Sequence, residues 1–257
     1  MDHLIFTAYS GMNGSMVRQR LIASNMANAQ TIGFRAETLT ATPVTLKVGP
    51  NGAPALEARA MTDGEVHGAS MAEGSLTQTG NPLDVALSGD AMLSVQAEDG
   101  TEAYTRRGDL SVSAGGVLQN GNGRPVIGSA GPISVPPGSK VTLSADGSVN
   151  VAQPDSPDAP PQVIDRIKLA STTGSKIAKG LDGLFRVVGV NGAGGTLPAN
   201  EDAKLQVGAL EQSNVNPSDV LIQMVEAQRL FDIRTKLVAT AKDIDEQGQG
   251  LMRLPAG

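Results

Sequence analysis

The two ends of this 257-residue chain carry apolar residues at helical spacing, whereas the segment between them does not. Residues 3–28 contain no proline, and their apolar positions recur at steps of three, four, six or seven residues. These positions are Ile5, Ala8, Met12, Met16, Ile22, Ala23 and Met26. We expect a helix of ~26 residues, about 39 Å long at the standard rise, that stops within 28–34, where Gly33 can adopt a positive φ. Gly11 and Gly14 weaken this helix by roughly 1 kcal/mol each, so it needs neighbours.

A second helix is expected near the other end of the chain. Asn216 can cap it, Pro217 suits the first helical position, and Asp219 favours the positive end of the helix dipole. One apolar stripe follows, formed by Val220, Met224, Ala227, Phe231, Val238 and Ala241. A second series widens it, formed by Leu221, Val225, Leu230, Ile233, Leu237 and Ile244. No Pro or Gly interrupts this stretch as far as about residue 246, and a helix this apolar on several sides needs more than one partner. Its charged residues are expected to form a solvated face; these are Arg229, Asp232, Arg234 and Lys236.

Between these helices the apolar pattern changes to period two or to short runs, which is typical of strands. The runs are Leu83–Leu87, Met92–Val95, Leu110–Val112, Val141–Leu143, Val149–Val151 and Val163–Leu169. Pairs that suit tight turns with a positive φ separate them, namely Asp99-Gly100, Arg107-Gly108, Gly115-Gly116, Asn120-Gly121, Asn122-Gly123 and Asp146-Gly147. The predicted fold class is therefore α+β, with N- and C-terminal helices pairing as a coiled coil and a central, mainly antiparallel β-rich domain.

The polar residues give no support for an enzyme or a nucleic-acid-binding protein. The formal net charge is -6, and no run of Lys or Arg could neutralise several phosphates. The two histidines lie far apart in the sequence, and the chain has no cysteine, so no metal-ligand set is apparent. We expect no catalytic residue, no cofactor and no metal, and no nucleic acid as a partner. No stretch approaches the roughly 18 apolar residues that insert into a bilayer, and the first residues lack the pattern of a cleaved signal peptide.

Several stretches resemble conserved parts of one protein family. Near the N-terminus lies Leu21–Arg35, which contains two Asn three residues apart and a Gly-Phe pair. The others are Gly74–Leu87, Ala103–Gly108, Leu210–Asn216 and Met224–Arg229. In this order they resemble the signatures of the flagellar rod and hook proteins, and the resemblance spans nearly the whole chain. Within that family the sequence is most similar to the proximal rod type, and the alternative is a distal rod or hook-type axial protein.

This resemblance implies a structural subunit of the bacterial flagellar basal body, in the rod that spans the periplasm. It also implies export through the flagellar type III apparatus without a cleaved signal peptide. The implied partners are other proximal and distal rod proteins, copies of the same chain, and the export apparatus. The expected divisions are an N-terminal helix and signature at 1–35, an extended connection at 36–73, a β-rich domain at 74–209 and a C-terminal helix at 210–257.

We expect the terminal helices to polymerise through apolar surface that one molecule leaves uncovered. The candidate subunit-interface residues are Ile5, Met12, Met16, Ile22, Asn25, Met26, Asn28, Gly33, Phe34, Asn214, Asn216, Met224, Gln228, Phe231 and Val238. For Asn25 and Asn28 two interpretations stay open, a hydrogen bond that fixes register or a local helix cap. Phe34 is expected to fill an apolar pocket beside the helix end. The rival classes are a secreted β-rich binding module, which would not need two such helices, and an unrecognised enzyme.

Overall fold

The computed structural model describes residues 2–44, 61–152, 160–189 and 194–252 and has the α+β class expected from the sequence. The chain divides into two compact units. The helical unit comprises Met1–Ala27, Glu37–Gly68 and Asn216–Gly257. The β unit comprises Asn28–Ala36 and Ala69–Val215. The chain therefore enters the β unit directly after the first helix, returns to the helical unit, and then crosses twice more.

Both terminal helices form where the sequence predicts them. Helix α1 spans Asp2–Ala27 and helix α2 spans Pro217–Met252. The Asn216 Oδ1 atom accepts a hydrogen bond from the Ser218 backbone N at 3.0 Å, which is the expected N-cap. The helix extends beyond the stretch that is free of Pro and Gly and continues through Gly248 and Gly250. A glycine costs a helix only about 1 kcal/mol and does not by itself terminate it.

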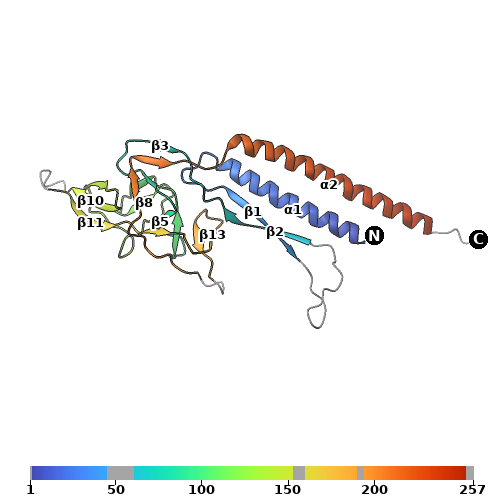
Figure 1. The fold of residues 1–257 in the computed structure, drawn as a ribbon, viewed down its shortest axis with the longest axis horizontal. Helices are drawn as coiled ribbons and strands as arrows, with labels where there is room; N and C mark the ends of the chain where they lie inside the picture. The colour runs from blue at the N-terminus through green and yellow to red at the C-terminus, as the bar shows by residue number, and fades with distance from the viewer. Residues whose placement is uncertain (1, 45–60, 153–159, 190–193, 253–257) are drawn as a thin grey trace, which may run out of the picture. The chain divides into compact units, whose positions relative to one another are not determined.

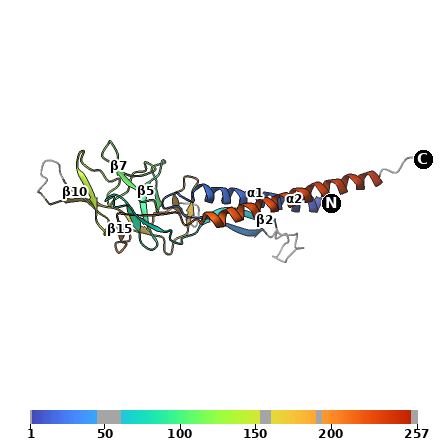
Figure 2. The ribbon, with the colours of Figure 1, turned by 90° about the horizontal axis from the view of Figure 1, so that it is seen from above.

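In the helical unit, α1 packs along α2 and the two helices run in opposite directions (Figure 1 and Figure 2). Strand β1 (Glu37–Val44) also contacts α1, and it pairs with β2 (Met61–Ala69) to form a two-stranded sheet. No helix among the described residues is long and apolar enough to cross a membrane.

The β unit is built from short strands in several small sheets. A five-stranded sheet has the order β12-β5-β6-β14-β13 and a three-stranded sheet the order β11-β10-β9, while β15-β4, β16-β3 and β7-β8 form pairs. The strand bounds are β3 Leu76–Gln78, β4 Val85–Leu87, β5 Ala91–Gln96, β6 Glu102–Thr105, β7 Leu110–Val112, β8 Leu118–Asn120, β9 Lys140–Leu143, β10 Ser148–Ala152, β11 Gln162–Arg166, β12 Leu169–Ser171, β13 Ile177–Lys179, β14 Phe185–Val187, β15 Leu205–Val207 and β16 Ala209–Glu211. Their pairings are antiparallel, as predicted.

One predicted strand is divided in the structure. The run Val163–Leu169 was expected to be continuous, but β11 ends at Arg166 and β12 begins at Leu169. Between them, the backbone N atoms of Ile167 and Lys168 donate to the carbonyl oxygens of Gly147 and Ile127. The chain changes sheets here, since β11 belongs to the three-stranded sheet and β12 to the five-stranded one. A run of apolar residues cannot reveal such a change, because both parts are apolar.

Two of the six glycines expected in tight turns do not adopt a positive φ. Four do adopt a positive φ, namely Gly100, Gly116, Gly123 and Gly147. Gly108 and Gly121 have no φ in the left-handed region, so the expectation is wrong for them. A Cβ atom at Gly108 would overlap the carbonyl oxygen of Val85, and one at Gly121 would overlap the carboxylate of Asp109. These two glycines permit close approach of neighbouring groups.

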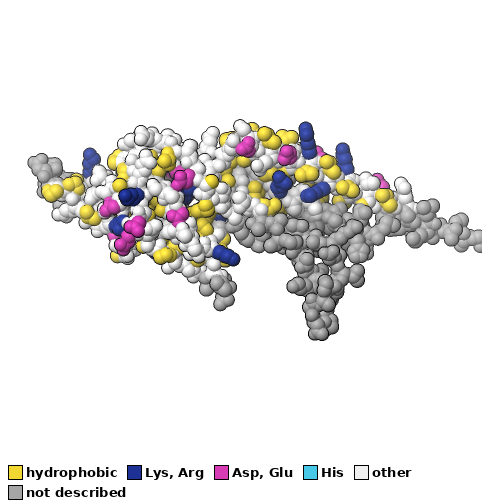
Figure 3. Space-filling model, viewed as in Figure 1, with side chains coloured by type: hydrophobic (Ala, Val, Ile, Leu, Met, Phe, Trp, Pro, Cys, Tyr) yellow, Lys and Arg dark blue, Asp and Glu magenta, His cyan; other side chains and the backbone are white. Residues whose placement is uncertain are grey.

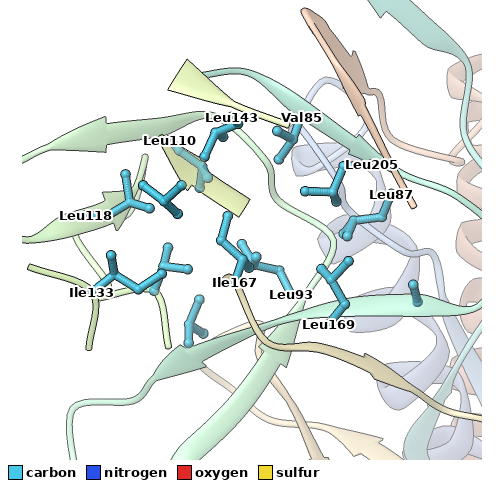
Figure 4. Packing of buried hydrophobic residues seen from close by; sticks show 14 of the residues in the cluster. Val85, Leu87, Leu93, Leu110, Leu118, Ile133, Leu143, Ile167, Leu169 and Leu205 are labelled. Atoms are coloured by element: carbon cyan, nitrogen blue, oxygen red, sulfur yellow. The ribbon is translucent and has the colours of Figure 1, made fainter. Parts of the chain in front are cut away.

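The core of the β unit is almost entirely aliphatic. Val85, Leu93 and Leu118 are among the fully buried side chains of its main cluster (Figure 4). A second cluster contains Met92, Tyr104 and Phe185. The Tyr104 hydroxyl accepts a hydrogen bond from the Leu197 backbone N at 2.5 Å, and burial raises the pKa of Tyr104 to about 12. Because aromatic residues are scarce, many branched aliphatic side chains fill this core.

Candidate functional site

Helix α2 exposes large apolar side chains over about half of its circumference. Among the large apolar side chains that the structure describes on this helix, seven are between 41% and 60% exposed. They are Leu221, Ile222, Val225, Leu230, Ile233, Leu237 and Ile244. Figure 3 shows hydrophobic side chains on the surface of this helix. Six of the seven are the second apolar series read from the sequence, so the series marks the uncovered face of the helix.

The opposite face of α2 is the one that meets α1. Its buried and partly buried positions alternate at steps of four and three residues, which is the heptad spacing. These positions are Val220, Met224, Ala227, Phe231, Arg234, Val238 and Ala241. Six of them are the first predicted stripe. Arg234 was expected on the solvated face, and this is wrong, because its side chain is partly buried and bonds to α1.

On α1 the corresponding positions follow the same spacing. Met12, Gln19 and Met26 are partly buried, and Ser15 and Ile22 are buried. Met16, a candidate interface residue, is 44% exposed and lies off this series. Gln228 on α2 is likewise exposed. The side chain of Ile5 lies outside the described residues.

Asn25 joins the end of α1 to the start of β1 within the helical unit. Its Nδ2 atom donates to the Glu37 carbonyl oxygen at 3.0 Å, and its Oδ1 atom accepts from the Glu37 backbone N at 2.8 Å. The side chain is 6% exposed. The Asn25 side chain therefore bonds both backbone groups of Glu37, as a neighbouring strand residue would. Asn28, in contrast, bonds locally to Thr31 through its Oδ1 atom at 3.1 Å.

Phe34 is covered by a cation. The ring is partly buried, and Lys179 Nζ lies 3.4 Å from its centroid. The same Nζ atom donates to the Arg35 carbonyl oxygen at 3.1 Å. The apolar pocket expected for Phe34 is thus replaced on one face by a cation–π contact.

Asn214 connects three segments of the β unit. Its Oδ1 atom accepts from the Ala36 backbone N at 2.6 Å. Its Nδ2 atom donates to the carbonyl oxygens of Ser70 and Ala72 at 3.0 and 2.8 Å. A carboxylate or an aliphatic side chain at this position could not both donate and accept in this way. Asn214 is therefore a structural link within the β unit.

Beside it lies a buried ion cluster formed by Arg35, Arg106 and Glu211, whose side chains are at most 2% exposed. Arg35 Nη2 lies 2.8 Å from Glu211 Oε1, and Arg106 Nε donates to Glu211 Oε2 at 2.8 Å. The remaining Arg106 donors bind the carbonyl oxygens of Leu87, Gly89 and Ala91. Glu211 Oε1 also accepts from the Gly74 backbone N at 2.8 Å. Burial, followed by repulsion from Arg106, lowers the pKa of Arg35, while Glu211 opposes that shift.

Sequence reasoning assigned no role to these three charged residues. Each lies inside a stretch that carried the family resemblance, but nothing local distinguishes a buried charge from a solvated one. The available signal was the place of Glu211 directly after the apolar pair Ala209-Leu210 in a strand. Gly33, which was a candidate, lies in the same region: it has a φ of 67°, and its backbone N donates to the Glu211 carbonyl oxygen at 2.8 Å.

Nothing in these arrangements suggests catalysis or metal binding. The described residues contain no group of three or more His, Cys, Asp or Glu that could hold a metal ion. The cavity beside Arg106 and Glu211 measures about 120 Å³, well below the roughly 300–1,000 Å³ of small-molecule sites.

Comparison with known proteins decides the family. Residues 86–151 match the family model described as flagellar hook protein FlgE/F/G D1 domain. Residues 206–251 match the one described as flagellar basal body rod FlgEFG protein C-terminal. The chain is 38% identical to the flagellar basal-body rod protein FlgF of Escherichia coli K12, over 95% of each chain. The chain belongs to the flagellar basal-body rod protein family. Its relatives are structural rod proteins, so it is a structural protein and not an enzyme.

Other relatives define its place within the rod family. FlgF of Salmonella typhimurium is 37% identical over 99% of this rod protein and 100% of the relative. FlgG of Bacillus subtilis is 27% identical over 97% and 98% of the two chains. The resemblance to the FlgF type expected from the sequence is confirmed, and the alternative rod type fits only weakly.

Proposed function

We propose that this chain is a structural subunit of the flagellar basal-body rod and that its paired terminal helices bind neighbouring subunits. The observation that carries this proposal is the exposed apolar face of α2, opposite the face that packs on α1. A soluble monomer seldom exposes so many large apolar side chains along one helix. Neighbouring subunits are the partners that would cover them.

The strength of this face fits an assembly with several contacts. Covering seven half-exposed apolar side chains contributes about 1 kcal/mol each, or roughly 7 kcal/mol in total. Association costs an estimated 4–15 kcal/mol in lost translational and rotational freedom. One such contact is therefore marginal. Subunits held by several neighbours at once, as in an axial polymer, share this cost over more contacts.

We further infer that α1 and α2 form an antiparallel coiled coil. The heptad spacing of Val220, Met224, Ala227 and Phe231, and of Met12, Ser15 and Ile22, supports this pairing. An intramolecular pair leaves the opposite α2 face available for other subunits. The divisions proposed from the sequence suit this arrangement, with segments 1–35 and 210–257 contributing the two helices.

The proposed partners follow from family membership. They are other rod proteins, proximal and distal, together with further copies of this chain and the flagellar export apparatus. The proposed location is the basal-body rod across the periplasm, reached by type III export without signal cleavage. An unfolded export route suits a chain that has no cysteine to form disulfides.

The experiment is a pair of matched double substitutions on α2. Ile233→Gln with Leu237→Gln removes apolar surface at two positions that are 56% and 53% exposed. Asp232→Gln with Lys236→Gln changes two exposed polar neighbours as the control. Each variant is produced in a strain that lacks its own copy of the gene, and swimming and rod incorporation are measured. We expect the first pair to lose both and the control to keep both, with unchanged circular dichroism for either. Full motility with the first pair would contradict the proposal.

A further inference from the structure

Arg234 is a charged residue at a heptad core position of α2. It falls between Phe231 and Val238 in the series of positions that face α1. Its Nη1 atom donates to the backbone carbonyl oxygen of Gly11 and to the Ser15 Oγ atom. A guanidinium in such a position is favourable only where acceptors meet it, since a buried unpaired charge is strongly unfavourable.

Helix α1 is shaped to receive this guanidinium at one place. A Cβ atom on Gly11 would lie 3.6 Å from Arg234 Nε, so the space next to the Gly11 backbone is occupied by the arginine itself. Ser15, one turn further, is 4% exposed and offers its hydroxyl as an acceptor. Such a Cβ atom would be in ordinary van der Waals contact with the arginine, whereas a Cβ atom at Gly14 would meet nothing within 4 Å, so the arginine side chain lies against α1 at Gly11.

Other alignments of the two helices lack the Ser15 hydroxyl and place a larger side chain where Gly11 lies. Sliding α1 by one heptad in one direction brings Arg18 and Ile22 to the places of Gly11 and Ser15. Arg234 would then face a like charge and an aliphatic side chain. Sliding it in the other direction brings Leu4 and Ala8 to those places, and neither side chain can accept a hydrogen bond. The apolar positions of the heptad, in contrast, can pack against any aliphatic side chain, so they discriminate poorly between alignments.

The alignment has a consequence for the assembly surface. Helix α2 has 36 residues and α1 has 26, so part of α2 extends past its partner (Figure 1). The alignment decides which α2 residues are covered by α1 and which are left for other molecules. A slip of one heptad moves that boundary by about 10 Å along the helix.

We propose that Arg234 is the residue that fixes the alignment of α1 on α2, through its bonds to Gly11 and Ser15. It acts as a polar core residue that selects one register at some cost in stability. This inference needs only the packing of the two helices, so it can fail while the rod function stands.

The test measures a distance between the helices in the full chain. Because the chain has no cysteine, spin labels can be placed at two exposed positions through Asn13→Cys and Gln223→Cys. Pulsed electron resonance then gives the distance distribution for the otherwise wild-type chain, for Arg234→Met and for Ser15→Ala. Methionine keeps the length of the side chain and can pack in a helix interface. Arg229→Met, at an exposed α2 position, is the matched control.

We expect one narrow distance for the wild type and for the Arg229→Met control. Arg234→Met should add populations shifted by the axial length of a heptad, about 10 Å, while circular dichroism shows helix content unchanged or higher. Ser15→Ala should give a smaller added population, since the Gly11 carbonyl remains. A single unchanged distance in Arg234→Met would overturn the proposal. So would a broad distribution in the wild type, because no alignment would then exist to be fixed.

Discussion

Arg35 and Glu211 form a buried ion pair with 2.8 Å between Nη2 and Oε1, although one lies just after the first helix and the other shortly before the last. Arg106 completes the cluster from the middle of the chain. One carboxylate therefore joins three distant parts of the sequence within the β unit. Buried ionised groups are tolerated only while all partners are present.

Replacing Glu211 by glutamine should destabilise the β unit strongly. The substitution keeps the shape of the side chain but leaves two buried guanidiniums without a counter-charge, which costs about 3–5 kcal/mol. Urea unfolding followed by circular dichroism measures the change in the free energy of unfolding. Glu201→Gln is the control, because Glu201 is an exposed carboxylate in the same unit. A change below about 1 kcal/mol for Glu211→Gln would mean that the cluster is not important for stability.

The stability of the β unit should fall in alkaline solution through Tyr104. Burial raises the pKa of Tyr104 to about 12, above the ordinary value near 10. The stabilisation is fully present below pH ~10 and is lost as the pH rises towards ~12, because the unfolded chain then loses its phenolic proton first. The loss is on the order of 2 kcal/mol. Comparing wild type with Tyr104→Phe between pH 9 and 12 tests it: the wild type should lose stability and the variant less so.

Smaller side chains on the α2 face that packs on α1 should destabilise the helical unit and leave the β unit unchanged. Met224→Ala with Phe231→Ala removes side-chain volume that packs towards α1, at roughly 1–3 kcal/mol for each partly buried residue. Hydrogen exchange should show faster exchange in α1 and α2 and unchanged protection in the β unit. Leu221→Ala with Ile244→Ala, on the exposed face, is the control. Loss of strand signal in circular dichroism would contradict the independence of the β unit.

The helices could be predicted from the sequence because helical periodicity, caps and proline are local signals. The spacing of the series from Val220 to Ala241 predicted the packed face of α2. The spacing of the series from Leu221 to Ile244 marked the exposed side chains. Arg234 shows the limit of this reasoning, since its position fitted the packed face but its charge suggested solvent. The signal that Arg234 would face α1 was its place in the heptad series between Phe231 and Val238.

Long-range contacts were beyond the sequence. The cluster of Arg35, Arg106 and Glu211 depends on segments that meet only after the β unit has folded. Likewise, a glycine required by close approach, such as Gly108, looks the same in sequence as one required by a turn. The change of sheet after Arg166 was hidden because the sequence is apolar on both sides of it, although Val163 and Ile164 of β11 are exposed and Leu169 of β12 is buried.

Gly33 offers the sharpest separation of backbone strain from close packing. Its φ of 67° makes any other residue unfavourable by about 1–2 kcal/mol, and Gly80, with a φ of 73°, carries the same cost. A Cβ atom at Gly33 would also overlap the backbone of Arg106 and Arg107, whereas one at Gly80 would meet nothing within 4 Å. We therefore expect Gly80→Ala to cost about 1–2 kcal/mol and Gly33→Ala several kcal/mol in urea unfolding, because the backbone must shift. Equal losses in the two variants would show that only the φ angle matters at Gly33. That result would remove the reason to regard the segment after α1 as closely packed against Arg106.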